Sequence, residues 1–293
     1  MFKNKTGFTL TEVLVTLAIV GVIIAISILT IRIVKTSYSP SDYFEFKNIP
    51  KITTEMTAEK NIKREKNMRR LTYIGHSAFF IEKDGEGILI DPFISGNPVA
   101  NFDYKNKKIS HIFVTHAHHD HLGDAIEISK NTGAIIVASF ELANYCIDKG
   151  AKAIGVNTGA HLNFNWGSVR ALNASHSSSN PDLAYGGACL SYLFDIDGTT
   201  IYHAGDTGLI PDFSLYGKIY NPYYAILPIG GQYTMGIEEA TIAAKMLYAT
   251  KVIPMHYNTF PPLKVDVTKF IDLLEAQGQK CLPLKANEYV ELW

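Results

Sequence analysis

Six consecutive positions near the middle of the chain carry four side chains that bind metal ions. They are His116, His118, Asp120 and His121. Neutral imidazole and carboxylate are suitable ligands for Zn²⁺ and its first-row neighbours. Four such groups cannot all reach one ion from so short a loop without strain, whereas two neighbouring ions can share them. The spacing therefore predicts a two-metal centre of the kind that hydrolases use, in preference to a polar surface loop that is merely rich in histidine.

The segments on either side predict how the chain holds this cluster. Residues 109–114 form a mainly apolar run, interrupted by Ser110 and His111, that is typical of a buried strand, and residues 122–130 indicate the start of a helix. If the strand persists to its end, His116 and His118 leave the same face of the sheet, because side chains two positions apart point the same way. We therefore expect the cluster at a strand-to-helix junction.

Three further candidate ligands each follow an apolar run that predicts a strand: His176, Asp206 and His256. A glycine precedes Asp206 and lets the backbone approach other groups closely. Taken singly, each of the three can be explained as a hydrogen-bonded surface or core residue. Together with the cluster they complete a ligand set, and we predict that all seven side chains bind metal.

The composition limits the architecture and the class of partner. A chain of 293 residues with 47% hydrophobic residues can bury one sizeable core or two small ones. Its 3 cysteines are odd in number and scattered, so they predict neither a disulfide framework nor a cysteine metal site. Residues 68–293 carry 17 Lys and Arg against 22 Asp and Glu. This mildly acidic balance argues against a nucleic-acid partner.

The N-terminal part predicts a membrane anchor. Residues 13–31 are 19 positions without a charge, and a helix of that length just spans a hydrocarbon core of about 30 Å. A secretory signal is less consistent, because it has a shorter apolar region closed by a small-residue cleavage site. We therefore predict a single N-terminal hydrophobic helix within residues 1–34, which would make the membrane a partner of this protein.

The residues before this run resemble the leader of type IV prepilins and pseudopilins, with a short basic stretch, Gly7, Phe8 and then Glu12. In that family a prepilin peptidase cuts after the glycine and methylates the new N-terminus. The resemblance therefore implies processing after Gly7, methylation of Phe8, and pairing of Glu12 with the terminal amine of a neighbouring subunit. An ordinary single-span anchor is the alternative.

A polar stretch separates this segment from the predicted catalytic part. Residues 35–67 have few apolar anchors and predict a solvated linker. Met68 then precedes a strand, and a protein that began there would lack nothing the chemistry needs. The hydrolase domain, residues 68–293, is thus predicted on the outer face of a membrane as part of a single-pass protein. It is cytoplasmic if translation starts at Met68.

Residues 68–293 predict an α/β fold. Short strands come first and alternating helices and strands follow, and this order occurs twice, which suggests two sheets packed face to face with helices outside. Asp84 and Gly85 predict a hairpin turn between the second and third strands. The predicted helices lie at residues 122–130, 141–149, 238–249 and 267–277.

The order His-x-His-x-Asp-His, lone His, Gly-Asp, lone His resembles the metallo-β-lactamase superfamily. Further stretches are similar to a family of uncharacterised metal-dependent hydrolases near the ascorbate-6-phosphate lactonase-like proteins. These stretches are residues 73–79, 90–93, 205–208, 228–231, 233–236 and 254–261. The similarity extends over residues 68–293.

This resemblance implies an αββα sandwich with the site at one edge, between the sheets. It assigns His116, His118 and His176 to one metal and Asp120, His121 and His256 to the other. Asp206 would bridge the two metals, and Asp91 would orient the histidine loop. His119 stays unassigned. Classical zinc β-lactamases of the best-known class have a cysteine where this chain has Asp206, so penicillin hydrolysis is disfavoured.

We therefore predict a hydrolase in which two divalent metal ions supply a hydroxide that attacks a small-molecule ester, lactone, amide or phosphoester. Zinc is the expected metal, with manganese or another first-row metal as alternatives. Asp120 would orient the nucleophile or shuttle its proton. His76 would contact substrate or donate a proton, with a structural role as the alternative. His203 is expected to pack, and the pocket candidates are Thr207, Tyr233 and Tyr257.

A different class of function is a pilin-like membrane or surface subunit with a structural role and a vestigial hydrolase domain. The N-terminal resemblance supports this alternative. The complete ligand set argues against it, because drift would be expected to remove some of seven ligands.

Overall fold

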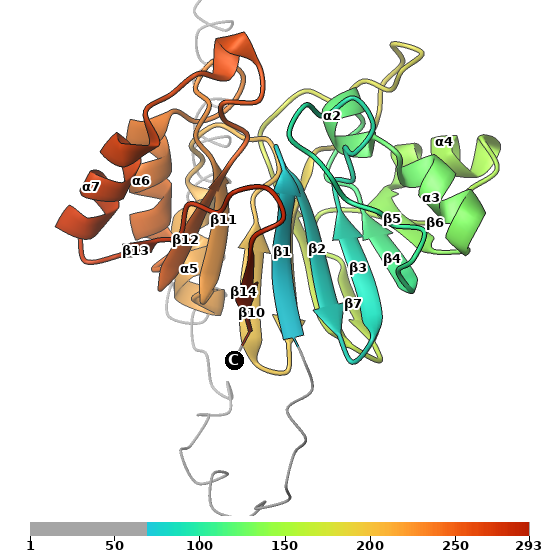
Figure 1. The fold of residues 1–293 in the computed structure, drawn as a ribbon, viewed down its shortest axis with the longest axis horizontal. Coiled ribbons are helices and arrows are strands. Elements are labelled where there is room, and N and C mark those ends of the chain that lie inside the picture. The colour runs from blue at the N-terminus through green and yellow to red at the C-terminus, as the bar shows by residue number, and fades with distance from the viewer. Residues whose placement is uncertain (1–68, 293) are drawn as a thin grey trace, which may run out of the picture. The chain divides into compact units, whose positions relative to one another are not determined.

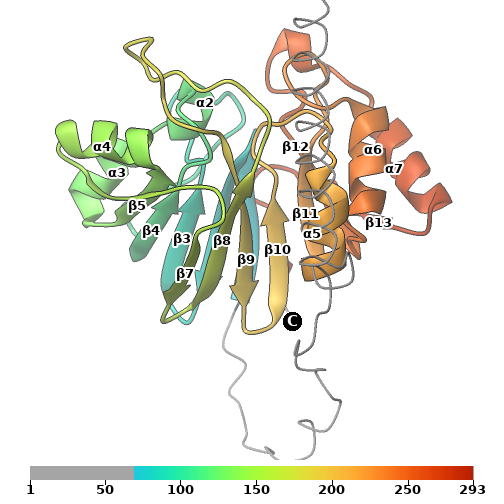
Figure 2. The same cartoon turned by 180° about the vertical axis from the view of Figure 1, so that it is seen from behind.

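Two sheets of seven strands face each other in residues 69–292, the part of the chain that the computed structural model describes (Figures 1 and 2). In spatial order the first sheet contains β14 (Tyr289–Glu291), β1 (Arg69–Gly75), β2 (Ala78–Lys83), β3 (Glu86–Ile90), β4 (Ile109–Phe113), β5 (Ile135–Ser139) and β6 (Lys152–Val156). The second contains β13 (Lys280–Cys281), β12 (Lys251–Met255), β11 (Tyr224–Pro228), β10 (Thr199–His203), β9 (Leu190–Ile196), β8 (Gly167–Asn173) and β7 (His161–Phe164).

Each sheet is antiparallel in one half and parallel in the other. Strands β14, β1, β2 and β3 pair antiparallel, and β3 to β6 pair parallel. In the second sheet β7 to β10 are antiparallel and β10 to β13 are parallel. The predicted hairpin turn is confirmed: Asp84 and Gly85 both have positive φ, 54° and 78°, as a tight turn between β2 and β3 requires.

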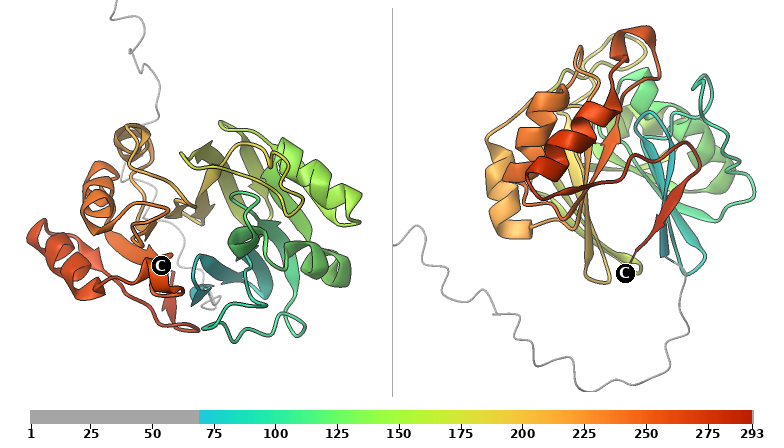
Figure 3. Two further views of the ribbon diagram at one scale, coloured as in Figure 1. Left: turned by 90° about the horizontal axis from the view of Figure 1, so that it is seen from above. Right: turned by 60° about the vertical axis from the view of Figure 1, so that its left-hand side comes forward.

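Helices cover the outer faces of both sheets, as the view from above shows (Figure 3). The first sheet is covered by α3 (Ala125–Thr132) and α4 (Phe140–Asp148), and α2 (His119–Leu122) lies at its edge. The second is covered by α5 (Asp212–Tyr220), α6 (Ile237–Met246) and α7 (Val267–Ala276). A short 3-10 helix, η2, spans Pro261–Leu263. The predicted α/β sandwich of two sheets between helices is confirmed.

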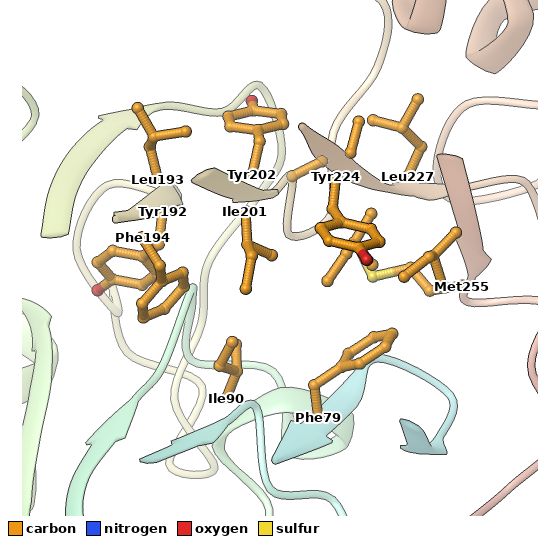
Figure 4. Packing of buried hydrophobic residues seen from close by; sticks show 14 of the residues in the cluster. Phe79, Ile90, Tyr192, Leu193, Phe194, Ile201, Tyr202, Tyr224, Leu227 and Met255 are labelled. Carbon is orange, nitrogen blue, oxygen red and sulfur yellow. The ribbon is translucent and has the colours of Figure 1, made fainter. Parts of the chain in front are cut away.

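Strand β2 illustrates why the strands are buried on both faces. Phe79 and Ile81 belong to the core between the sheets, whereas Ala78 and Phe80 belong to the core beneath the helices of the first sheet. Side chains alternate along a strand, so a strand covered on both sides reads as a continuous apolar run. Figure 4 shows Phe79 facing Tyr224 of the second sheet across this inter-sheet core.

One predicted helix is divided in the structure. The segment 122–130 is the end of α2 followed by α3, with Gly123 between them at φ 42°. A Cβ on Gly123 would lie 2.4 Å from the carbonyl oxygen of Pro92, so only glycine fits there. Asp124 then accepts hydrogen bonds from the backbone N–H groups of Ile94 and Ser95, at 2.9 and 2.7 Å. The contacts of Gly123 and Asp124 therefore hold the histidine loop against the segment that follows β3.

The predictions for residues 1–34 and 35–67 lie outside the described residues. Among residues 69–292 no helix is both long and apolar enough to cross a membrane. The structure thus describes the predicted hydrolase domain without its first position, Met68, and its last, Trp293.

Candidate metal centre

All the predicted metal ligands lie at one edge of the sandwich because of strand direction. Strands β1, β3 and β4 run the same way in the first sheet, and β8, β10 and β12 run the same way in the second. Each of these strands ends just before a candidate side chain. In chain order the candidates are His76, Asp91, the cluster of residues 116–121, His176, Asp206 and His256.

The first group of side chains is His116, His118 and His176. Their ligand atoms lie within 4.8 Å of one another. Nε2 of His116 is 3.0 Å from Nδ1 of His118, and the ring centroids of His116 and His176 are 5.1 Å apart. Burial lowers the pKa of all three imidazoles, that of His116 furthest. They are therefore neutral at neutral pH, which is the state that binds a metal ion.

The second group is Asp120, His121 and His256, together with His76. The ligand atoms of these four also lie within 4.8 Å of one another. Nε2 of His256 is 3.8 Å from Oδ2 of Asp120. Burial opposes a charge on His256, but Asp206 and Asp120 outweigh it and raise its pKa to about 9. In the same way, Asp206 and Asp91 overcome burial and raise the pKa of His121 well above its ordinary value.

Asp206 lies between the two groups. Its Oδ1 is 3.2 Å from Nε2 of His121. Its Oδ2 is 3.0 Å from Nε2 of His256 in the second group and 3.6 Å from Nε2 of His176 in the first. Burial alone would raise the pKa of Asp206, but His121 and His256 hold it well below its ordinary value. The side chain is therefore a buried carboxylate that reaches both groups.

Three buried atoms at this centre have no hydrogen-bond partner among the described residues: Nε2 of His121, Oδ1 of Asp206 and Nδ1 of His256. The first two face each other at 3.2 Å, but their geometry is not that of a hydrogen bond. Unpaired buried polar atoms are rare because each costs about 1–3 kcal/mol. A divalent cation satisfies a nitrogen and a carboxylate oxygen at once, so this donor set fits a metal site.

Residues 70–256 match the β-lactamase superfamily domain. A metal-dependent hydrolase of Geobacillus thermodenitrificans, assigned to UPF0173, is 44% identical over 227 residues, which are 76% of this chain and all of the relative. The chain belongs to the metal-dependent hydrolases of the β-lactamase superfamily. A UPF0173 relative from Pyrococcus furiosus is 45% identical over 77% of this chain and its own whole length. The matched part of this chain is thus an entire protein in these relatives.

A solved structure and a second match agree with this assignment. Igni18, a metallo hydrolase from the archaeon Ignicoccus hospitalis, is 41% identical with a TM-score of 0.70, over 76% of this chain and 98% of its own. The metallo-β-lactamase fold is therefore confirmed for this hydrolase. Separately, residues 2–28 match the prokaryotic N-terminal methylation motif, so the prepilin-like leader is also recognised.

Asp91 holds the histidine loop of this hydrolase, residues 116–121, in place through hydrogen bonds. The carboxylate is fully buried. Its Oδ1 accepts a hydrogen bond from the backbone N–H of Thr115 at 2.7 Å, and Oδ2 accepts from the Thr115 hydroxyl at 2.7 Å. Oδ2 is also 2.7 Å from Nδ1 of His121. Because the other ring nitrogen of His121 then faces Asp206, Asp91 fixes the orientation of this imidazole.

His76 contacts Asp120 and does not line the cavity at the metal centre. Its Nε2 is 3.1 Å from Oδ2 of Asp120, and its Nδ1 is 3.0 Å from the hydroxyl of Thr259. Burial lowers the pKa of His76 to about 4, so the ring is neutral at neutral pH. A neutral ring donates from Nε2 to the Asp120 carboxylate and accepts from Thr259. This geometry favours the structural alternative for His76 over contact with substrate.

Three residues of the site have left-handed backbones: His76 at φ 60°, Asp91 at φ 44° and His256 at φ 55°. Such conformations cost about 1–3 kcal/mol each in non-glycine residues and persist where the surroundings enforce them. Here the backbone N–H of His256 donates to the carbonyl oxygen of His76 at 2.8 Å. This bond links the two sheets directly beneath the centre.

A cavity of about 410 Å³ opens onto the centre. From the predicted set it is lined by His118, Asp120, His176, Asp206, His256 and Tyr233, and the unassigned His119 lines it too. Of the three pocket candidates, only Tyr233 lines it. Thr207 is buried and bonds the backbone of Ser175 and Gly208, and Tyr257 is half-buried elsewhere. His203 is buried between the backbones of Ser77 and Gly205, in the packing position expected.

Sequence reasoning missed the loop after His176, which supplies the other cavity residues: Ser177, Ser179, Asn180, Pro181 and Leu183. A signal was available, because Asn180-Pro181-Asp182 is a turn sequence directly after a candidate ligand. Thr259, the partner of His76, was also missed. It carries no metal-binding group, and nothing in its sequence position indicates the contact.

Proposed function

We propose that this centre holds two divalent cations, with zinc as the first candidate and manganese or another first-row metal as alternatives. His116, His118 and His176 would hold one cation, and Asp120, His121 and His256 the other. Asp206 would bridge them. The observation that carries the proposal is the position of the Asp206 carboxylate, within 3.6 Å of a nitrogen from each group.

When bound, a pair of divalent cations lowers the pKa of water and polarises the electrophilic centre of a substrate. The chain's own contribution comes from the groups that face the cavity. Asp120 is partly exposed to it, and the nearby His256 imidazole and the hydrogen bond to His76 together outweigh burial and keep the pKa of Asp120 well below the ordinary value. It therefore remains a carboxylate that can orient a water molecule and accept its proton. The substrate would be a small ester, lactone, amide or phosphoester.

The direct test is metal analysis of the chain from Met68 onward, which corresponds to the whole length of the relatives. We expect about two equivalents of metal per chain and hydrolysis in a screen of lactones, esters, amides and phosphodiesters. His116→Ala is the control: it should retain less metal and lose activity. Purified protein that binds no metal under loading conditions would contradict the proposal.

The match of residues 2–28 to the methylation motif favours a second proposal about the same chain. We propose that a prepilin peptidase cleaves after Gly7 and methylates Phe8, and that residues 13–31 anchor the hydrolase domain at the outer face of a membrane. Mass spectrometry of the protein from its native cells tests this, because the N-terminus would be methylated Phe8. An N-terminus at Met68 would instead mean a cytoplasmic hydrolase.

A purely structural pilin-like role is the competing function. It predicts that the chain enters filaments, and that incorporation persists when His116 and Asp206 are both replaced by alanine. The structural role would be favoured if that double variant lost hydrolysis but cells carrying it kept their normal phenotype. The seven candidate ligands gathered at one edge support the hydrolase instead, because a scaffold does not need buried, mutually facing metal-binding atoms.

A further inference from the structure

The loop after His176 forms a hairpin that projects beyond the edge of the sandwich at the end where α2 lies (Figures 1 and 2). Ser179 and Tyr185 pair across it. At its tip, Oδ1 of Asn180 accepts hydrogen bonds from the backbone N–H groups of Asp182 and Ala184, both at 3.0 Å. The turn is therefore built by a specific side chain, and it determines where the residue between them, Leu183, is displayed.

The backbone conformation and the exposure of Leu183 both reduce the stability of the folded protein. Its backbone has φ 61°, a conformation that bulky residues rarely adopt, and its side chain is 87% exposed. Folding stability alone would favour asparagine or glycine at such a position. Leu183 nevertheless lines the cavity over the metal centre. A strained backbone and an exposed apolar side chain together indicate a functional role for this position.

The base of the hairpin is fixed to the metal-binding loop. The backbone N–H of Ala117 donates to the hydroxyl of Ser178 at 3.2 Å, and the hydroxyl of Ser139 donates to the carbonyl oxygen of Gly186 at 3.1 Å. A Cβ on Gly186 would lie 2.3 Å from the Cβ of Ala117, so the two segments are in direct contact. The location of Leu183 relative to the centre is thus set by the fold.

The remaining cavity residues give the mouth its chemical character. Pro181 and Tyr233 line it beside Leu183, and the Tyr233 side chain is 55% exposed. Among the lining residues of the described part of the chain, 69–292, there is no lysine or arginine, whereas there are two carboxylates, Asp120 and Asp206. Phosphoryl groups are usually recognised by arginine, lysine or a helix N-terminus. Lys149, which approaches the hairpin from α4, is paired with Asp182 at 3.3 Å.

We propose that the substrate is an uncharged carboxylic ester or lactone whose apolar chain contacts Leu183, Pro181 and Tyr233. This inference rests on the proposed hydrolase function and narrows it, because it excludes phosphoesters. In the reaction, the oxygen of a water molecule bonds to the acyl carbon and the acyl C–O bond breaks. One proton of that water ends on the released alcohol oxygen. The other proton is released when the carboxylic acid product ionises. An ester thus gives a carboxylate, a proton and an alcohol, a lactone gives a hydroxy carboxylate and a proton, and no further reactant is required.

The test compares 4-nitrophenyl acetate, butyrate and octanoate with the anionic diester bis(4-nitrophenyl) phosphate, on metal-loaded protein from Met68 onward. We expect kcat/KM to rise roughly twofold per added methylene, as for partly buried CH₂ groups, and to be lowest for the phosphate. Leu183→Asn keeps the left-handed turn and removes the apolar side chain. It should lower kcat/KM for octanoate about tenfold, mainly through KM, and leave acetate nearly unchanged.

Leu215→Asn is the matched control, because Leu215 is a half-exposed leucine on α5 outside the cavity lining. It should leave the chain-length preference intact. Calorimetric binding of 1-octanol, which is uncharged, has the same chain length and contains no acyl bond to hydrolyse, gives a readout independent of turnover. The proposal is overturned if the phosphate is the best substrate, if chain length has no effect, or if Leu183→Asn affects acetate and octanoate equally. If 1-octanol binds the unmodified protein and not Leu183→Asn, yet no ester is hydrolysed, the proposed hydrolysis fails while the apolar recognition surface stands.

Discussion

Oδ2 of Asp91 lies 2.7 Å from Nδ1 of His121, and both side chains are fully buried. The carboxylate belongs to the segment after β3 and the imidazole to α2, so one contact joins two of the elements that form the centre. A histidine whose outer nitrogen is held by a carboxylate presents its other nitrogen in a fixed direction and as a stronger base.

Asp91→Asn is therefore expected to weaken metal binding about 10- to 100-fold. The asparagine amide has only one acceptor oxygen. It therefore cannot accept hydrogen bonds from both Thr115 and His121, as the two oxygens of the carboxylate do. Competition against a chromogenic chelator measures the change. Asp84→Asn is the control, because Asp84 is exposed in the β2–β3 turn. Equal affinity in the two variants would contradict the role assigned to Asp91.

Asp206→Asn should remove metal from both groups, because the carboxylate reaches nitrogens of each. We expect metal content to fall to about one equivalent or less and activity to fall at least about 100-fold, since the shared ligand of a two-metal site is lost. Elemental analysis alongside initial rates tests this. A variant that kept its full metal content would show that Asp206 does not bridge.

His76→Gln tests whether His76 acts by positioning Asp120. Glutamine can still donate to the carboxylate but cannot also accept from Thr259 in the same geometry. If His76 acts through Asp120, we expect kcat to fall roughly tenfold with metal content and KM nearly unchanged, because His76 does not line the cavity. Thr259→Val should move kcat in the same direction by less. A large rise in KM in either variant would argue for direct substrate contact.

Gly205→Ala tests the close approach that precedes Asp206. Gly205 has φ 61°, and an added Cβ would lie 2.9 Å from the carbonyl oxygen of Leu190 and from Cβ of Thr115. We expect a loss of about 2–4 kcal/mol in the free energy of unfolding, from backbone strain plus overpacking. Gly198→Ala, with φ 87° and open space around it, should lose only about 1 kcal/mol. Urea denaturation measures both, and equal losses would contradict the packing argument.

Most strands, and the gathering of the candidate ligands at strand ends, could be predicted because both depend on local pattern. Apolar runs such as residues 252–255 end where the first polar side chain, His256, begins, and metal-binding residue types at those ends are rare by chance. Helix α5, Asp212–Tyr220, was missed. Its only buried residues are Phe213, Tyr216 and Gly217, and a nine-residue segment with two buried side chains and a glycine has little helical periodicity of its own. Packing against α6 stabilises it instead.

The role of His76 could not be predicted for a different physical reason. Its sequence neighbours show a strand end with a polar residue, which fits contact with substrate as well as support of a ligand. The partners of the two ring nitrogens distinguish these two roles. Those partners, Asp120 and Thr259, are 44 and 183 positions away in the sequence. Likewise, the exposure of Leu183 follows from a turn geometry whose direction is set by contacts at its base.

The last strand of the fold returns to the first. The backbone N–H of Leu292 donates to the carbonyl oxygen of Arg69 at 3.0 Å, so β14 ends where β1 begins. That point is at the sheet edge opposite the ligands, one strand of seven residues away. A short linker could therefore join the two ends, and new termini could be opened at a surface turn such as Asp84-Gly85. A segment attached at either end of the hydrolase domain therefore joins it at the end of β1 away from the candidate ligands.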